Sequence, residues 1–162
     1  MAKGYTQNHD MDYDETFAPM AKMRIVRVVL VVAATWGWHL HQMDVKNAFL
    51  QGDLEEHLFM VQPHGFQSKM NKSIVFRLKK SFYGLKQAPR AWNSKITQRV
   101  RKMGFEVLKS GSSLFIRKVP KGLVCILLYV DDMVVTDPNL AKISHVKSQL
   151  SSAFEMKDLG WK

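Results

Sequence analysis

Two adjacent carboxylates, Asp131 and Asp132, lie in the most apolar stretch of the chain. They interrupt residues 127–135, "LLYVDDMVV", and the wider run 123–136 carries no other charge. An Asp pair between two strands is often simple turn chemistry, because Asp forms turns readily. Adjacent carboxylates in an apolar setting also repel each other and lose hydration, which a bound cation would relieve. Mg²⁺ suits such a site, since it takes oxygen ligands and typically binds one or two carboxylates plus substrate phosphates.

A third acid, Asp44, ends a candidate strand over residues 38–45. Three acids at strand ends would suit two metal ions about 3.5–4 Å apart, which clamp the attacking and leaving oxygens of a phosphoryl displacement. The sequence alone does not place Asp44 beside the Asp pair. It contains no Walker-type loop or dinucleotide Gly fingerprint, so phosphate binding would depend on metal and basic side chains.

The excess positive charge of the chain is concentrated in one stretch. The net charge is +10, and residues 69–109 hold twelve Lys or Arg and one acid, Glu106, so this stretch carries +11 and the remainder −1. A solvated basic face is one interpretation. Aromatic residues within the stretch indicate folded structure, which favours a surface that binds a polyanion such as nucleic acid.

Length and composition are typical of one globular domain. The chain has 162 residues, and 46% of them are hydrophobic, which is enough for a sizeable core. No apolar run is long enough to span a bilayer, and the polar N-terminus has no signal-peptide core. We therefore expect no membrane partner and no secretion. The single Cys125 lies in an apolar run and is predicted to be a buried small residue.

Periodicity and punctuation predict an α+β domain with an antiparallel sheet and helices on one face. Residues 24–36 are rich in β-branched residues, which by propensity favour a strand. The run is long for a strand, however, and Gly37 suits a helix C-terminus, so we predict a helix. A helix from Pro89 to Gly104 has Trp92, Ile96, Val100 and Met103 on one face and a basic stripe beside it. Strands are predicted over residues 38–45, 57–62 and 73–78 and on both sides of the Asp pair in 123–136, and a short helix is predicted in 46–54. A further helix is predicted over 137–154, with Asp137 as its cap and Pro138 as its first residue. Its buried face would consist of Leu140, Ile143, Val146, Leu150 and Phe154.

Several segments together closely resemble one known family across essentially all 162 residues. They include "QMDVKNAFLQGDLEEHLFMVQPHGF", "YGLKQAPRAW", "LLYVDDMVVT" and "FEMKDLG", in the order and spacing of that family. The family is the reverse transcriptase of copia-type LTR retrotransposons. A "YVDD" alone would be weak evidence, whereas these motifs in combination are highly specific.

The resemblance implies a right-hand polymerase, with a palm and partial fingers over residues 1–162 and no thumb, connection or RNase H. Asp44, Asp131 and Asp132 match its catalytic acids and would bind two Mg²⁺ ions, with Mn²⁺ as a substitute. Asp44 and Asp131 would be the principal ligands, and Asp132 would complete the site. Phe49 matches an aromatic residue beneath the sugar of the incoming nucleotide, called the gate, whose ring collides with a ribose 2′-OH and so favours deoxynucleotides. The alternative is that Phe49 is an aromatic residue of the core. The residues implied to bind the deoxynucleoside triphosphate (dNTP) are Val45, Lys46, Asn47, Ala48, Phe49, Gly84 and Gln87.

The resemblance also implies contacts with an RNA or DNA template-primer. The candidate nucleic-acid contacts are Lys79, Lys80, Lys86, Arg90, Lys95, Arg99 and Lys102. Lys157 is a candidate general acid for the departing pyrophosphate, and a solvated surface lysine is the alternative. The expected activity is RNA-directed DNA synthesis, and the expected location is cytoplasmic virus-like particles or the nucleus. The chain would be part of a Pol polyprotein whose other parts are absent from this sequence. The alternatives are a catalytically inactive nucleic-acid-binding remnant and a degenerate reading frame without function.

Overall fold

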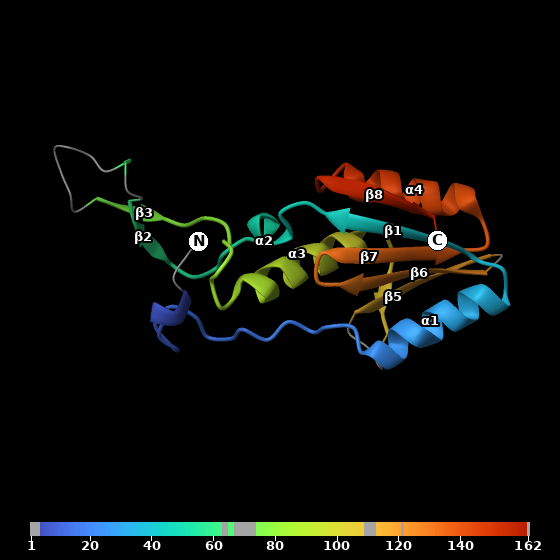
Figure 1. Cartoon of the computed structure of the whole chain (residues 1–162), viewed down its shortest axis with the longest axis horizontal. Coiled ribbons are helices and arrows are strands. Elements are labelled where there is room, and N and C mark those ends of the chain that lie inside the picture. Colours follow the sequence, from blue (N-terminus) through green and yellow to red (C-terminus); the bar gives the residue numbers. More distant parts are fainter. Residues whose placement is uncertain (1–3, 63–64, 67–73, 109–112, 121, 162) are drawn as a thin grey trace.

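The computed structural model describes residues 4–62, 65–66, 74–108, 113–120 and 122–161. Within them an antiparallel sheet has the strand order β4-β5-β6-β7-β1-β8, and a separate two-stranded sheet pairs β2 with β3 (Figure 1). The helices are Gly4–Thr6 (η1, 3-10), Met23–Thr35 (α1), Ala48–Gln51 (α2), Ala88–Lys102 (α3) and Leu140–Ser151 (α4). The strands are His39–Val45 (β1), Phe59–Val61 (β2), Val75–Arg77 (β3), Glu106–Val107 (β4), Leu114–Val119 (β5), Gly122–Tyr129 (β6), Asp132–Asp137 (β7) and Met156–Trp161 (β8).

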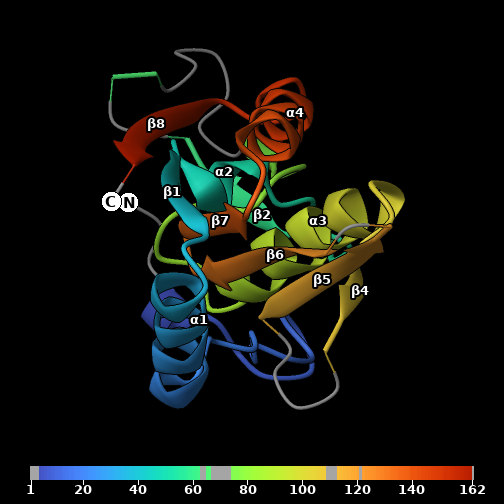
Figure 2. The ribbon, with the colours of Figure 1, turned by 90° about the vertical axis from the view of Figure 1, so that its right-hand side faces the viewer.

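Helices cover both faces of the large sheet, so the prediction of helices on one face is wrong. α3 and α4 pack on one face, where Trp92 and Ile143 join the core with alternate residues of β6 and β7. α1 packs on the other face through Val29, against Leu127 and its neighbours. Figure 2 shows α1 and the α3–α4 pair on opposite sides of the sheet. The β-branched residues of α1 are accommodated because one side of the helix packs on the sheet.

Glycines end the two long helices as the sequence predicts. Gly37 adopts a left-handed φ of +64° after α1, and the Trp38 amide donates back to Ala33 O at 2.8 Å. Gly104 (φ +83°) does the same after α3, and Phe105 N donates to Val100 O at 3.3 Å. These backward bonds satisfy carbonyls that a helix end leaves unpaired. They direct the chain from α1 into β1 and from α3 into β4.

The start of α4 differs from the prediction. Asp137 is fully buried at the end of β7, Asn139 caps the helix by accepting from Ala141 N, and the helix begins at Leu140. Asp137 instead accepts from Asn139 N at 2.6 Å, and Leu140 is exposed. Ile143, Val146, Leu150 and Phe154 are buried as predicted. Strands β4, β5 and β8 were not predicted.

None of the helices in the described part of the chain is long and apolar enough to cross a membrane.

Candidate active site

The acids predicted to be catalytic lie where β1 meets the β6–β7 hairpin. Asp44 is the cross-strand partner of Asp132, and Asp132 is the partner of Tyr129. On its other side Asp44 faces Lys157 of β8. Because directly opposite residues share a face, these four residues form one row across the end of the sheet. We call it the Asp44 row.

The Asp44 row lies on the face opposite α3 and α4. Its sequence neighbours Met43 and Met133 are buried on the α3–α4 face, and side chains alternate along a strand. α1 packs on the same face as the row, against a cluster that includes Cys125 and Leu127 of β6 but no residue of the row. Asp44 and Asp132 are half-buried, while Tyr129 and Lys157 are exposed. All four side chains of the row are therefore at least partly accessible to solvent.

The hairpin turn is held from two directions. Val45 N donates to Asp131 O at 3.0 Å, which fixes the turn to β1 directly after Asp44. From beneath, the Trp92 indole nitrogen donates to Val130 O at 2.6 Å. Val130 has φ +57°, a region that a β-branched residue rarely adopts. Such strain persists only where surrounding structure imposes it, and it is frequent at functional sites.

A polar side chain orients one of the facing carboxylates. Gln42 Nε2 donates to Asp132 Oδ1 at 3.0 Å. Neither Gln42 nor Trp92 was predicted from the sequence to contribute to the site. The period-2 alternation of β1 was a usable signal for Gln42, because a residue two positions before Asp44 lies on the same face. Trp92 appeared only as a core residue, since its partner is a backbone carbonyl far away in the chain.

The carboxylates of Asp44 and Asp132 are suitable ligands for a divalent metal, but by themselves they do not complete its coordination shell. Carboxylate oxygens are the ligands that Mg²⁺ prefers, and two of them suffice when substrate phosphates complete the shell. Across the ranges described, no three or more His, Cys, Asp or Glu side chains are grouped so that they could hold a metal ion. The donor chemistry of Asp44 and Asp132 thus fits Mg²⁺. Convergence of all three acids stays a prediction.

Phe49 lies on α2, the short helix that follows β1. Its side chain is partly buried, and its ring centroid lies 5.1 Å from that of Tyr83 with the planes tilted by 55°. Two backbone amides predicted to lie along a triphosphate are already bonded within the protein. Val45 N donates to Asp131 O, and Lys46 N donates to Glu155 O at 2.9 Å. The nearby Lys46 ammonium pairs with Glu155 at 2.7 Å, a hydrogen bond that raises the pKa of Lys46.

Comparison with known proteins assigns the chain to a family. A family model described as reverse transcriptase (RNA-dependent DNA polymerase) matches residues 1–162. The chain belongs to the reverse transcriptase family. The retrovirus-related Pol polyprotein from transposon RE1 of Arabidopsis thaliana is 42% identical over 158 residues, which are 98% of this chain and 11% of that protein.

Two further relatives place the family in other hosts. The Pol polyprotein from transposon TNT 1-94 of Nicotiana tabacum is 40% identical over 161 residues, covering 99% of this chain and 12% of that protein. The putative transposon Ty5-1 protein of Saccharomyces cerevisiae is 38% identical over 118 residues, 73% of this chain and 38% of that protein. The chain thus spans about a tenth of the plant polyproteins it matches. The family to which the chain belongs is one of nucleotidyltransferases.

The "YGLKQAP" segment of this reverse transcriptase chain binds the N-terminal arm, residues 4–15. Gln87 is 1% exposed; its Oε1 accepts from Gln7 Nε2 at 3.0 Å and its Nε2 donates to Asp12 O at 2.9 Å. Lys86 N donates to Gln7 Oε1 at 2.9 Å, and its ammonium lies 5.0 Å from the Tyr13 ring centroid. Contact of Gln87 with a nucleotide therefore requires the arm to move.

The backbone of this arm also packs closely against the backbone of Gly84. A Cβ on Gly4 would lie 1.8 Å from Gly84 O, so the two backbones pack at a distance that only glycine permits. Gly84 itself has φ +97°. The resemblance implied that Gly84 binds the dNTP, and in the structure its backbone packs against Gly4.

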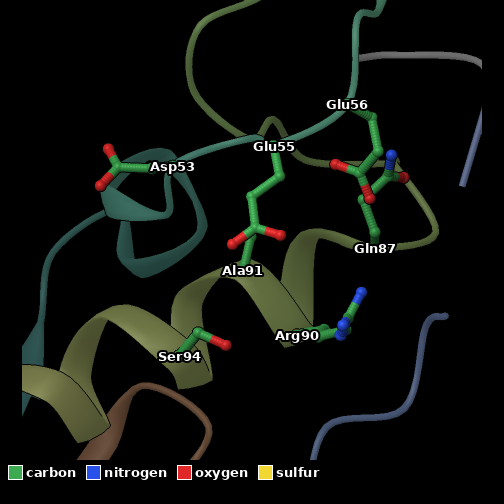
Figure 3. Close-up of a pocket in the computed structure, with 7 residues that line it drawn as sticks. All are labelled: Asp53, Glu55, Glu56, Gln87, Arg90, Ala91 and Ser94. Carbon is green, nitrogen blue, oxygen red and sulfur yellow. The ribbon is translucent and has the colours of Figure 1, made fainter. Parts of the chain in front are cut away.

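A small pocket of about 50 Å³ lies between the start of α3 and residues 53–56 (Figure 3). Asp53, Glu55 and Glu56 line one side, and Arg90 of α3 and Gln87, the residue before this helix, line the other. Three carboxylates would repel a phosphate, so this pocket is unsuited to the triphosphate. Arg90, a candidate nucleic-acid contact, pairs with Glu15 at 3.5 Å.

The basic stripe on α3 makes structural contacts and lies on the face opposite the Asp44 row. Lys95 pairs with Asp53. Arg99 donates to Gln149 O at 2.8 Å and to the Ser152 hydroxyl at 3.2 Å, which ties α3 to the end of α4. Lys79, Lys80 and Lys102 are exposed. Nucleic-acid binding by these side chains stays a prediction, and Arg99 has a structural role as well.

Proposed function

We propose that this chain is the palm and partial fingers of a copia-type reverse transcriptase, which adds deoxynucleotides to a primer 3′-end on an RNA or DNA template. The observation that carries the proposal is the Asp44 row. It pairs two half-buried carboxylates, Asp44 and Asp132, on the sheet face opposite α3 and α4. Family membership supplies the reaction class.

Five residues in or beside the row have a chemical role in this proposal. Asp44 and Asp132 would hold Mg²⁺ or Mn²⁺ from facing strands, with Asp131 joining from the turn. When bound, two such ions stabilise the attacking and leaving oxygens of an in-line displacement. Gln42 orients the Asp132 carboxylate. Lys157 stands next to Asp44 in the register, where its ammonium could give a proton to departing pyrophosphate.

Phe49 would set the sugar specificity. Its helix begins three residues after Val45, so it lies next to the end of the strand that carries Asp44. An aromatic ring beneath the sugar leaves no room for a 2′-hydroxyl, which favours deoxynucleotides.

Primer extension tests this function. The chain should extend oligo(dT) on poly(rA) with Mg²⁺ and dTTP, and Asp131→Asn should abolish extension. Asp53→Asn is the matched control, because Asp53 pairs with Lys95 away from the row. Extension that survives in Asp131→Asn would refute the assignment of the acids.

A second candidate is a nucleic-acid-binding remnant without activity. It is favoured by the +11 charge of residues 69–109, and in the described side chains no three or more His, Cys, Asp or Glu are grouped so that they could hold a metal ion. A remnant would bind a template-primer duplex with strong salt dependence and would not extend it.

A further inference from the structure

We propose that Tyr83 is a positioning residue that fixes the Phe49 ring and thereby contributes to sugar selectivity. This inference rests on the proposed function of Phe49 as the gate. It concerns Tyr83, the first residue of the motif "YGLKQAPRAW", to which no role was assigned from the sequence. The reason to look for such a residue is that α2 is too short to hold its own side chains in place.

α2 consists of four residues, Ala48–Gln51. One helical turn is unstable on its own, because nucleation fixes several residues for a single hydrogen bond. Its N-cap residue, Asn47, is left-handed (φ +51°) and makes no side-chain capping bond. The direction of the Phe49 side chain must therefore be set by tertiary contacts.

Residues 81–83 supply contacts at both ends of α2. The buried Ser81 hydroxyl donates to Phe49 O, and Ser81 N donates to Gly52 O at 2.9 Å. Two residues further on, the Tyr83 ring packs against the Phe49 ring at 5.1 Å between centroids. The same segment thus holds the backbone of α2 and the side chain of Phe49.

The other side of α2 is closed by α3, which lies beside it in both views (Figures 1 and 2). A Cβ on Gly52 would lie 2.8 Å from Ala91 C and from Trp92 N. This close approach keeps α2 from moving toward α3. The Phe49 side chain also packs against the core on the α3–α4 face and against the buried Leu58, Leu85 and Ala88, but it can still rotate about its own bonds. Tyr83 limits that rotation, because a tilted aromatic pair prefers a narrow range of geometries.

The test compares Tyr83→Ala with Tyr83→Phe, which keeps the ring and removes only the hydroxyl. The readout is the ratio of kcat/KM for dTTP to that for UTP in primer extension by the full chain. Loss of one aromatic pair should lower this ratio roughly 3- to 10-fold in Tyr83→Ala, whereas Tyr83→Phe should keep it. Equal loss of both activities, with an unchanged ratio, would show a merely structural role and overturn the proposal.

A double-mutant cycle separates this inference from the gate itself. If Phe49→Ala leaves the ratio unchanged, the gate is wrong and the role of Tyr83 falls with it. If Phe49→Ala lowers the ratio and Tyr83→Ala does not, only the Tyr83 proposal fails. In a Phe49→Ala background, Tyr83→Ala should change the ratio no further, because the two side chains act as one unit.

A second readout needs no turnover. In NMR spectra of the chain with labelled aromatic residues, the Phe49 and Tyr83 rings should show mutual NOEs. Tyr83→Ala should shift the Phe49 ring signals, and Tyr83→Phe should leave them nearly in place. Lack of the NOEs, or Phe49 signals that do not respond to Tyr83→Ala, would refute the contact. Tyr83→Leu serves as a volume-retaining replacement if Tyr83→Ala does not fold.

Discussion

Trp92 connects the packing of the core to the geometry of the candidate active site. Its indole is 1% exposed, its ring packs edge-to-face on Phe154 at 5.2 Å, and its Nε1 donates to Val130 O at 2.6 Å. Val130 is the strained residue of the turn that presents Asp131. The substitution Trp92→Phe keeps an aromatic ring in the core and removes this hydrogen bond.

The cost of Trp92→Phe has two parts. Leaving Val130 O without its donor costs about 1–3 kcal/mol. The smaller ring leaves a cavity worth about 1–2 kcal/mol, well below the cost of truncating Trp to Ala. For a domain of this length each kcal/mol lowers Tm by about 2–4 °C. We expect the free energy of unfolding to fall by roughly 2–5 kcal/mol.

The assay is urea and thermal unfolding followed by circular dichroism, with Trp36→Phe as the control. Trp36 is 67% exposed, so its replacement should stay within about 0.5 kcal/mol of the wild type. Primer extension by Trp92→Phe, measured where the variant is folded, should also fall because the turn loses its support. Equal stability of Trp92→Phe and Trp36→Phe would refute the reasoning.

Three further predictions follow from buried contacts elsewhere. Gln7→Ala leaves Oε1 of the buried Gln87 without its donor and should lower the free energy of unfolding in urea by about 1–3 kcal/mol. Gln98→Ala, at an exposed position of α3, should be neutral; equal effects of the two substitutions would refute the docked arm. Gly52→Ala forces a Cβ to within 2.8 Å of the α3 backbone and should destabilise by about 1–3 kcal/mol; an unchanged Tm would contradict this packing. Cys125 is buried, which raises its thiol pKa to about 11. It should resist iodoacetamide until the chain unfolds, and its contribution to stability, present below pH ~9, should be lost as pH rises toward 11; rapid native alkylation, or the same alkaline loss in Cys125→Ala, would contradict this.

Local signals in the sequence predicted much of the fold. Gly37 and Gly104 marked helix ends, and apolar runs marked β1, β6 and β7, because backbone conformation and burial leave direct traces in residue type. β8 was not predicted because it is an edge strand that contains charged residues and, in the described part of the chain, pairs with β1 alone. It therefore lacks an alternating apolar pattern. Asp137 was read as a cap because the sequence does not reveal that β7 continues through it.

The residues of the candidate site were predicted from the sequence, but their contacts were not. Asp44 and Asp132 face each other because β1 lies beside β7, a register that spacing along the chain does not determine. The burial of Gln87 depends on an arm some 75–80 residues earlier in the sequence. Such long-range partners leave no periodic signal.

We propose that Asp44 and Asp132 bind divalent metal from facing strands. Titration with Mn²⁺ followed by electron paramagnetic resonance measures this directly, in the presence of template-primer and dTTP. We predict that Asp44→Asn weakens Mn²⁺ binding at least tenfold, and that Asp53→Asn leaves it unchanged. Equal Mn²⁺ affinity in the wild type and Asp44→Asn would contradict the account.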